Sequence, residues 1–273
     1  MSQTIDQAFI SQFESEVHLA YQRMGSKLRN TVRTKSNING KDTTFQKAGK
    51  GIAGQKSRHG KVPTMSIAHT KVLATLADYY AADYVDDLDE LKTNIDERNV
   101  VVETAAGALG RKSDELLIAV TDATSNVVVH GSAAMNQTKI NTVFNYFGDN
   151  DVPDDGQRNW VIGPQQWTNL LGISAFSDAD FVGSDDLPYK GGMVARRWMS
   201  FLWFTHSGLT KASTTRTTMA YHKRALGFAS GRDITSRWDW IPEKASMFYQ
   251  ANQSQGAVEI DSTGVYRVEC TES

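Results

Sequence analysis

Glycines at residues 49–54 are the first candidate for chemistry in this sequence. The stretch GKGIAG has the GxGxxG spacing of dinucleotide-binding loops, which need an apolar strand before the glycines and a helix after them. Here the polar TTFQKA precedes the glycines and the basic QKSRHGKV follows them. Gly60 and Lys61 resemble the end of a phosphate-binding loop, but Gly54 lies one residue too far upstream. We therefore interpret the stretch as a flexible loop and expect no nucleotide there.

Metal and nucleophilic chemistry find little support in the residue spacing. None of the six histidines is spaced as HxH or HExxH, and the single cysteine, Cys270, excludes a cysteine-rich zinc site. The adjacency of His206 and Ser207 does not indicate a catalytic triad, and no GxSxG motif is present. The acidic DNDVPDDG lacks the spacing and the terminal glutamate of a calcium loop. We expect no enzyme activity, no metal and no cofactor, although a site built from distant residues would escape this reasoning.

The distribution of charge is more informative than the net charge of -2. Residues 23–61 are strongly basic, with Asp42 as their only acid, and residues 78–103 are strongly acidic. The basic segment could contact nucleic-acid phosphates, but only Phe45 is available there for base stacking. An acidic protein surface explains the charge equally well, and residues 78–103 supply such a surface.

The composition limits the class of protein. With 273 residues, of which 40% are apolar, the chain can bury a sizeable core in one domain or in two or three subdomains. No apolar run is long enough for a transmembrane helix, and the first residues lack the basic and apolar regions of a signal peptide. We expect folding in the cytoplasm, in keeping with a single cysteine, and no membrane contact.

A long amphipathic helix predicted over residues 85–120 should organise the other elements. Its apolar stripe consists of Leu88, Leu91, Ile95, Val102, Ala105, Leu109, Leu116 and Val120. The opposite face is charged and includes Asp114. Gly107 and Gly110 should mark close contacts or a bend, because glycine is unfavourable inside a helix. At about 1.5 Å per residue, the helix would extend roughly 50 Å and act as a spine or a coiled coil.

The elements before this helix follow from periodicity and composition. Residues 4–28 predict an amphipathic helix. Residues 36–64 are polar, basic and rich in glycine, which predicts a disordered loop or a long projecting hairpin. Residues 66–76 would be the returning strand of that hairpin, followed by a more helical segment at 78–85.

The elements after the helix indicate a mixed α/β subdomain over about residues 130–250. They are a strand at 125–129, a helix at 135–150, a strand at 158–162, a helix at 164–171, strands within 193–207 and a strand or helix at 218–231. The final GAVEIDSTGVYRVECT predicts a hairpin, which must add to a sheet elsewhere in the molecule.

Four motifs stand out within these elements: VDDLDELKTNIDERN, AAGALGRKSDELLIAV, RNWVIGPQQWTNLL and GAVEIDSTGVYRVECT. With the order of the elements, they resemble the major capsid proteins of tailed bacteriophages, which share the Hong-Kong-97-type fold, and the resemblance covers about residues 20–273. The resemblance implies an α+β fold with an N-terminal arm, an extended E-loop, a P-domain with a long spine helix and an α/β A-domain. The implied bounds are 1–35 for the arm, 36–78 for the E-loop, 79–130 and 250–273 for the P-domain, and 131–249 for the A-domain.

The resemblance also implies a function and a set of partners. The chain would self-assemble through hexamers and pentamers into an icosahedral head that encloses double-stranded DNA, in the cytoplasm of a bacterial host and then in the virion. Other copies, a portal protein, a decoration protein and non-specifically bound DNA are implied partners. A separate scaffolding protein is implied because no long charged coiled-coil prefix precedes the arm. We predict no covalent cross-link, since no reactive lysine–asparagine pair can be identified.

In such a shell, the E-loop of one subunit would lie across the P-domain of the next. We therefore expect basic residues of the loop to contact acidic residues of a neighbour. The basic residues are Lys41, Lys47, Lys50, Lys56, Arg58 and Lys61. The acidic residues are Asp83, Asp86, Asp87, Asp89, Glu90, Glu97 and Glu103. Two alternatives stay open: an encapsulin-like nanocompartment shell that holds cargo enzyme, and a basic-arm nucleic-acid-binding protein.

Overall fold

The computed structural model describes residues 25–86, 97–178 and 192–272. The helix expected over residues 4–28 lies mostly outside these ranges, and residues 25–28 are not helical. The chain forms two compact units, which we describe separately. Unit 1 comprises Met1–Gly25, Asp78–Arg111 and Ile234–Gln253, and unit 2 comprises Ser26–Ala77, Lys112–Asp233 and Ser254–Ser273. This division does not test the expected domain bounds, which remain a prediction.

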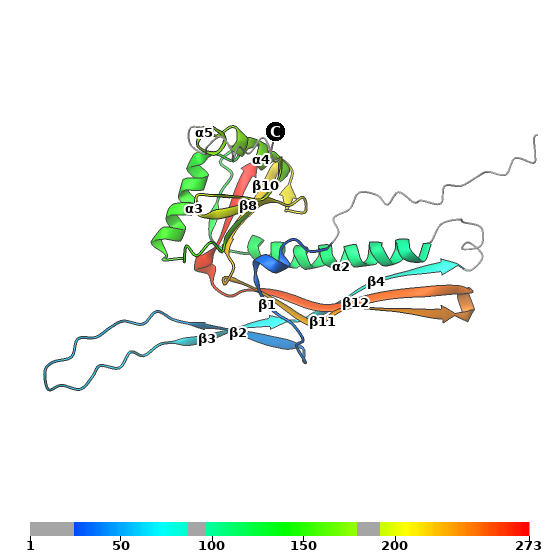
Figure 1. The fold of residues 1–273 in the computed structure, drawn as a ribbon, viewed down its shortest axis with the longest axis horizontal. Helices are drawn as coiled ribbons and strands as arrows, with labels where there is room; N and C mark the ends of the chain where they lie inside the picture. The colour runs from blue at the N-terminus through cyan, green and yellow to red at the C-terminus, as the bar shows by residue number, and fades with distance from the viewer. Residues whose placement is uncertain (1–24, 87–96, 179–191, 273) are drawn as a thin grey trace, which may run out of the picture. The chain divides into compact units, whose positions relative to one another are not determined.

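A seven-stranded mixed sheet dominates unit 2 (Figure 1). Its strands follow the order β5-β13-β10-β6-β8-β7, and β9 pairs with β10. They are β5 (Val127–Val128), β6 (Arg158–Ile162), β7 (Arg196–Trp198), β8 (Phe201–Thr205), β9 (Lys211–Ala212), β10 (Thr215–His222) and β13 (Val265–Thr271). β6 runs parallel to β8 and antiparallel to β10. All five residues of β6 are buried, which is typical of a central strand that is covered on both faces.

Among the described residues, three helices lie wholly within unit 2: α3 (Gln137–Asp149), α4 (Pro164–Leu171) and the single turn α5 (Ser174–Ser177). The Asn136 side chain caps α3 by accepting a hydrogen bond from the Lys139 backbone N–H at 3.0 Å. Pro164 opens α4 in its first turn, and Gly172 ends it. The helices predicted at 135–150 and 164–171 are therefore confirmed, as are the strands predicted at 125–129, 158–162 and within 193–207.

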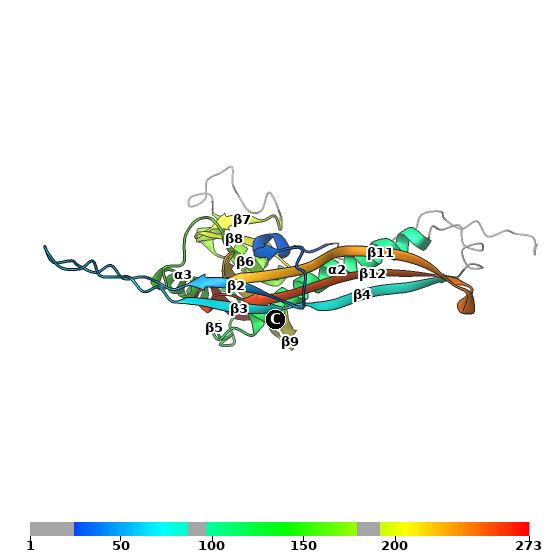
Figure 2. The ribbon, with the colours of Figure 1, turned by 90° about the horizontal axis from the view of Figure 1, so that it is seen from below.

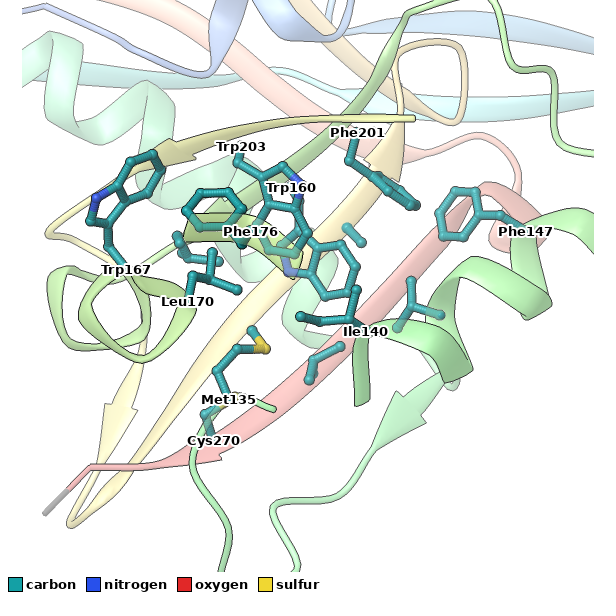
Figure 3. Close-up of a cluster of buried hydrophobic side chains, with 14 of the residues drawn as sticks. Met135, Ile140, Phe147, Trp160, Trp167, Leu170, Phe176, Phe201, Trp203 and Cys270 are labelled. Atoms are coloured by element: carbon teal, nitrogen blue, oxygen red, sulfur yellow. The ribbon is translucent and has the colours of Figure 1, made fainter. Parts of the chain in front are cut away.

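Aromatic side chains fill the core of unit 2 (Figure 3). Trp160 of β6 and Trp203 of β8 stack with their ring centres 4.3 Å apart. Phe201 meets Trp160 edge-on at 5.1 Å, and Phe147 of α3 meets Phe201 edge-on at 5.2 Å. All four side chains are fully buried. Offset-stacked and edge-to-face contacts are the favourable geometries for aromatic pairs, so this core is specifically packed.

Two further strands of unit 2, β2 (Asp42–Ala48) and β3 (His69–Thr75), form the projecting hairpin that the sequence predicts (Figure 1). Seven residue pairs make the antiparallel ladder, from Asp42↔Thr75 to Ala48↔His69. The strand expected at 66–76 is thus confirmed from His69 on. Residues 49–68 continue outward as two legs without a regular strand.

The long helix α2 (Glu97–Asp122) belongs to unit 1 up to Arg111 and to unit 2 from Lys112 on, and a second sheet has the order β1-β11-β12-β4. These strands are β1 (Arg33–Lys35), β4 (Ala77–Asp86), β11 (Leu226–Ile241) and β12 (Ser246–Glu259). Figure 2 shows β11, β12 and β4 side by side along their length. Within unit 1, Ala105 and Leu109 of α2 pack against Tyr249 and Ala251 of β12, and all four are buried. The prediction of a close contact at Gly110 is confirmed: a Cβ there would lie 2.6 Å from the Gly25 Cα.

The long helix does not begin where the sequence predicted. Residues 85 and 86 end strand β4, the next ten residues lie outside the described ranges, and α2 is helical from Glu97. The helical prediction for 78–85 was also wrong, since this segment belongs to β4. Tyr79 and Ala81 pack on the helix-facing side while Tyr80 is exposed, which is the two-residue alternation of a strand.

The predicted apolar stripe was misplaced in the second half of α2. Leu116 and Val120 are only half-buried, whereas Leu117 and Ile118 are buried. Asp114, which we expected on the charged face, is fully buried beside Ser113. Helical spacing continues from Leu109 through Ser113 and Leu117, so a polar residue occupies a core-facing position that an apolar pattern cannot reveal.

Two strand predictions near the C-terminus are resolved differently. The stretch at 218–231 forms two strands, β10 and the start of β11. The predicted hairpin at 256–271 was wrong, because β12 and β13 belong to different sheets. The turn between them, Ser262–Gly264, is fixed by Asp261, whose side chain accepts from the Thr263 backbone N–H at 3.1 Å. β13 does add to a sheet elsewhere, between β10 and β5.

Candidate functional site

The β2–β3 hairpin and its two outer legs, residues 41–75, are called the basic arm from here on, as distinct from the N-terminal arm expected at 1–35. Its backbone pairing continues one step past the strands, where the Gly49 N–H donates to the Ala68 carbonyl at 2.7 Å. Further out, the glycines allow the two legs to touch. A Cβ on Gly51 would lie 2.1 Å from the Met65 Sδ, and a Cβ on Gly54 would lie 2.7 Å from the Pro63 Cγ. The GKGIAG stretch is therefore one leg of a narrow arm rather than a nucleotide loop.

The base of the basic arm is held firmly. Phe45 of β2 is fully buried, and a Cβ on Gly227 of β11 would lie 2.9 Å from its ring. The Arg33 guanidinium and the Lys35 ammonium lie 5.6 Å and 5.0 Å from the centre of the same ring. The Lys35 ammonium also donates to the Thr44 carbonyl at 2.6 Å. These contacts fix the direction in which the arm extends from the rest of unit 2.

The six basic residues expected to make contacts are distributed along this arm. Lys41, Lys56, Arg58 and Lys61 are exposed. Lys47 pairs with Asp261 at 2.7 Å, and Lys50 pairs with Asp151 at 2.7 Å. Burial alone would raise the pKa of Asp261, but hydrogen bonds from Lys47 and Thr263 outweigh it and lower the pKa. Two of the six cations therefore already have partners in their own chain.

Exposed apolar side chains accompany these cations. Ile52 is 85% exposed, Val62 is 70% exposed and Met65 is 53% exposed. Single exposed apolar residues are ordinary, but these three, together with Ile67 and Leu73, leave the arm with an apolar surface that no described residue covers.

The expected acidic partners belong to unit 1. Asp83 and Glu103 are exposed, and Asp86 is half-buried. Asp87, Asp89 and Glu90 lie outside the described residues, and Glu97 begins α2. The acidic set is therefore only partly placed by the structure.

Sequence reasoning missed an aromatic strip next to these acids. Tyr80 and Tyr84 of β4 are 63% and 45% exposed. The Tyr84 ring lies 4.8 Å from the Phe248 ring of β12, and the Lys244 ammonium lies 3.8 Å from its centre. Tyr80 and Tyr84 are an even number of residues apart and therefore share one face of a strand. The strip could have been predicted if residues 78–85 had been recognised as a strand.

A buried polar node around Asp114 was also missed. Its carboxylate accepts hydrogen bonds from the Ser26 hydroxyl at 2.5 Å and from His206 Nε2 at 2.9 Å. It also accepts from the backbone N–H groups of Lys27 and Leu28 at 3.2 Å and 3.1 Å. Because the Gly208 N–H donates to His206 Nδ1 at 3.1 Å, Nε2 carries the hydrogen. Burial alone would raise the pKa of Asp114, but these donors lower it, so the group is an anion that joins three segments of unit 2.

A second node fixes the end of β13. The Glu272 carboxylate accepts from Arg216 Nε at 2.5 Å, from the Lys211 ammonium at 2.6 Å and from the Gln166 amide at 3.2 Å. Burial would raise the pKa of Glu272, but these donors lower it to about 2. Both nodes have the geometry of structural ion pairs.

Metal binding, thiol chemistry and membrane insertion are the other possibilities for the part of the chain that the structure describes. Within it, no three histidine, cysteine or carboxylate side chains are grouped to hold a metal ion. Cys270 is buried, and burial raises its pKa to about 11, which keeps the thiol unreactive. None of the described helices is long and apolar enough to span a membrane.

Comparison with known proteins gives one consistent result. The sequence profile of the phage capsid protein family matches residues 5–272. The capsid structure of the cyanophage P-SCSP1u is similar with a TM-score of 0.79 at 15% identity, covering 100% of this chain and 96% of that chain. A structure from Mycobacterium phage Che8 has a TM-score of 0.76 at 17% identity, covering 95% and 97% of the two chains. For the cyanophage Pam1 capsid the values are 0.73, 11%, 97% and 97%. The sequence matches none of the curated proteins.

The structural likeness establishes the fold, and the profile establishes the family. The α+β, Hong-Kong-97-type architecture expected from the sequence is confirmed. The profile match spans nearly the whole sequence and includes the basic arm, α2 and the seven-stranded sheet. The chain therefore belongs to the phage capsid protein family and is a structural component of the phage head.

Proposed function

We propose that this chain is a major capsid protein that self-assembles through hexamers and pentamers into an icosahedral head around double-stranded DNA. The observation that carries this proposal is the basic arm, which is anchored at its base and exposes cations and apolar side chains beyond residue 49. Ordering such a segment costs about 1–2 kcal/mol per residue, so a contact outside the subunit must offset the cost. A neighbouring copy supplies that contact at every position of a closed shell.

The contact expected from the sequence follows as the next part of the proposal. The arm of one subunit lies on unit 1 of a neighbour, with Lys41, Lys47, Lys50, Lys56, Arg58 and Lys61 near Asp83, Asp86, Asp87, Asp89, Glu90, Glu97 and Glu103. The aromatic strip at Tyr80 and Tyr84 supports this arrangement, because it offers apolar area to Ile52 and Val62 beside the acids. Each exposed ion pair adds only about 0–1 kcal/mol, so repetition around the shell and apolar burial must provide most of the stability.

Further partners belong to the same proposal. A separate scaffolding protein guides curvature, a portal protein occupies one vertex, and a decoration protein binds outside. Packaged DNA contacts the shell without sequence specificity. Assembly takes place in the cytoplasm of the bacterial host. Support for these partners comes only from the resemblance to tailed-phage capsid proteins.

Negative-stain electron microscopy of the chain, expressed alone and with its neighbouring genes, tests the function. We expect closed shells, rings or tubes built from hexamers and pentamers. Shells that contain cargo enzyme instead of DNA would favour the nanocompartment alternative. A monomer of about 30 kDa under every condition would overturn the proposal and favour the basic-arm nucleic-acid binder.

Charge reversal tests the contact itself. The double variant Lys56→Glu/Arg58→Glu should lower shell yield severalfold, because both residues are exposed and lie at the end of the arm. Reversing two exposed arginines elsewhere, Arg197→Glu/Arg232→Glu, is the matched control and should assemble normally. Combining the arm variant with Asp83→Lys should restore part of the yield. Equal loss in arm and control variants, or yield that is insensitive to salt, would contradict the contact.

A further inference from the structure

A basic groove lies in unit 2, between the segment that leads into β1 and the turn from β10 to β11. Its volume is about 620 Å³. The polar side chains that line the groove are Asn30, Arg33, Thr34, Gln157, Lys223 and Arg224. Three cations line the groove. Arg33 belongs to the basic segment at 23–61, whereas Lys223 and Arg224 are distant in the sequence and are brought beside it by the fold.

The positive charge of this basic groove is poorly balanced. In the described part of the chain, neither Arg33 nor Lys223 has a carboxylate within ion-pair distance. Arg224 approaches the Asp155 carboxylate only at 3.9 Å, and Asp155 accepts a hydrogen bond from His222 Nε2 at 3.0 Å. Like charges that are gathered without counter-ions create a local positive potential that attracts anions.

The walls of the groove are held in place from behind. Arg33 pairs with Gly227 in the β1–β11 ladder, and its guanidinium lies 5.6 Å from the centre of the Phe45 ring. The Lys223 backbone N–H donates to the Gln157 carbonyl at 3.1 Å. The Thr31 hydroxyl lies 2.5 Å from the Tyr221 hydroxyl, which ties the β1 segment to β10. Fixed walls reduce the entropy that a ligand must overcome on binding.

We propose that this basic groove binds phosphate groups of a nucleic-acid backbone. Arginine, lysine, amide and hydroxyl side chains are the groups that contact phosphates in proteins, and all four kinds line the groove. The one apolar side chain that lines it, Val32, is 2% exposed, so nothing there can stack on a base. An acidic peptide is a poorer fit, because protein interfaces are centred on apolar or aromatic anchors. Binding should therefore be independent of sequence.

The choice of DNA as the natural ligand rests on the proposed function, whereas the anion site rests on the groove alone. The experiment measures binding of the full-length, unassembled chain to a fluorescent DNA duplex of about 20 base pairs over a salt series. Each phosphate contact contributes about 0.9 to the slope of log affinity against log salt. The variant Arg33→Gln/Lys223→Gln should lower that slope by about 1.8 and weaken binding at least about tenfold at low salt.

A matched variant separates this site from overall charge. Lys71→Gln/Arg237→Gln removes one lysine and one arginine that are exposed elsewhere, and it should change affinity by less than about threefold. Thermal unfolding of both variants checks that they are folded, because Arg33 also contacts Phe45. Equal weakening in the two variants, or no binding by the wild type, would overturn the proposal. Binding of polyglutamate that is tighter than DNA binding and is lost in Arg33→Gln/Lys223→Gln would assign the groove to an acidic protein instead.

Electron microscopy of the same samples keeps this proposal apart from the proposed function. A groove variant that forms normal shells but binds DNA weakly supports the phosphate site. A wild type that never forms shells, yet binds DNA through the groove, would leave the site intact and remove the capsid function.

Discussion

The core around β6 and the outer half of the basic arm differ in what surrounds their apolar side chains. Trp160, Trp203 and Phe201 are fully enclosed by their own chain. Ile52 and Val62 have comparable apolar character but remain mostly in water. The first region is complete within one subunit, whereas the second exposes apolar side chains that we propose to be covered by a neighbouring subunit. The contrast separates residues that serve the fold of the subunit from residues to which the proposed function assigns its contacts.

The largest effect should come from opening the core. Trp160→Ala removes a fully buried ring that stacks on Trp203, and we expect it to lower the free energy of unfolding by about 3–5 kcal/mol. Urea unfolding followed by tryptophan fluorescence and circular dichroism measures the change. A loss below about 1 kcal/mol would contradict the view that this cluster determines stability.

A slightly smaller loss is expected at the Asp114 node. Asp114→Ala leaves His206 and two backbone N–H groups without their buried acceptor, which should cost about 3 kcal/mol. Its neighbour Glu115 is exposed and pairs with Lys112 at 2.9 Å, so Glu115→Ala is the control and should change stability by less than about 0.5 kcal/mol. Similar losses in both variants would show that the node is not special.

The Glu272 node should make stability depend on pH. Its pKa is about 2 in the folded chain, below the ordinary value of 4.5. A lowered folded pKa gives a contribution that is complete above about pH 4.5 and is lost as the pH falls toward 2. The contribution amounts to no more than about 3 kcal/mol. Urea unfolding between these pH values should therefore show a steeper loss for the wild type than for Glu272→Gln, and parallel curves would exclude the effect.

The smallest change in subunit stability should come from the arm. Ile52→Ala/Val62→Ala removes apolar area that is already in water, so the free energy of unfolding should change by less than about 0.5 kcal/mol. Shell yield should nevertheless fall, because the same side chains are proposed to be covered on assembly. A variant that keeps full yield would show that the arm acts through its charges alone.

The sequence predicted most of the elements because their patterns are local. The strand at 158–162, with Pro164 opening the next helix, is bounded by residues that act on their own backbone. Strand β4 was mistaken for a helix because its alternation involves alanines and tyrosines with little contrast in polarity. The hairpin at 256–271 failed because two consecutive strands do not reveal that a short turn sends them into different sheets.

The sites were harder to predict than the elements, for a physical reason. The cations of the arm lie close together in the sequence, within residues 41–61, so composition alone revealed them. Asp114 and His206 are 92 residues apart, and only the fold makes a buried pair of them. The basic groove likewise combines Arg33 with Lys223 across the β1–β11 pairing. A single sequence carries no signal for such meetings.

The narrow, exposed legs of the basic arm also make it a protease substrate. Lys50, Lys56, Arg58 and Lys61 are trypsin sites in a segment without a regular strand, and exposed segments of this kind are where proteases cut first. Beyond the base at Phe45, cleavage there would leave the rest of unit 2 intact. If assembly covers the arm, trypsin cleaves only the free subunits. The amount of full-length chain that a short trypsin treatment splits on a gel would then measure how many subunits remain free as the shells form.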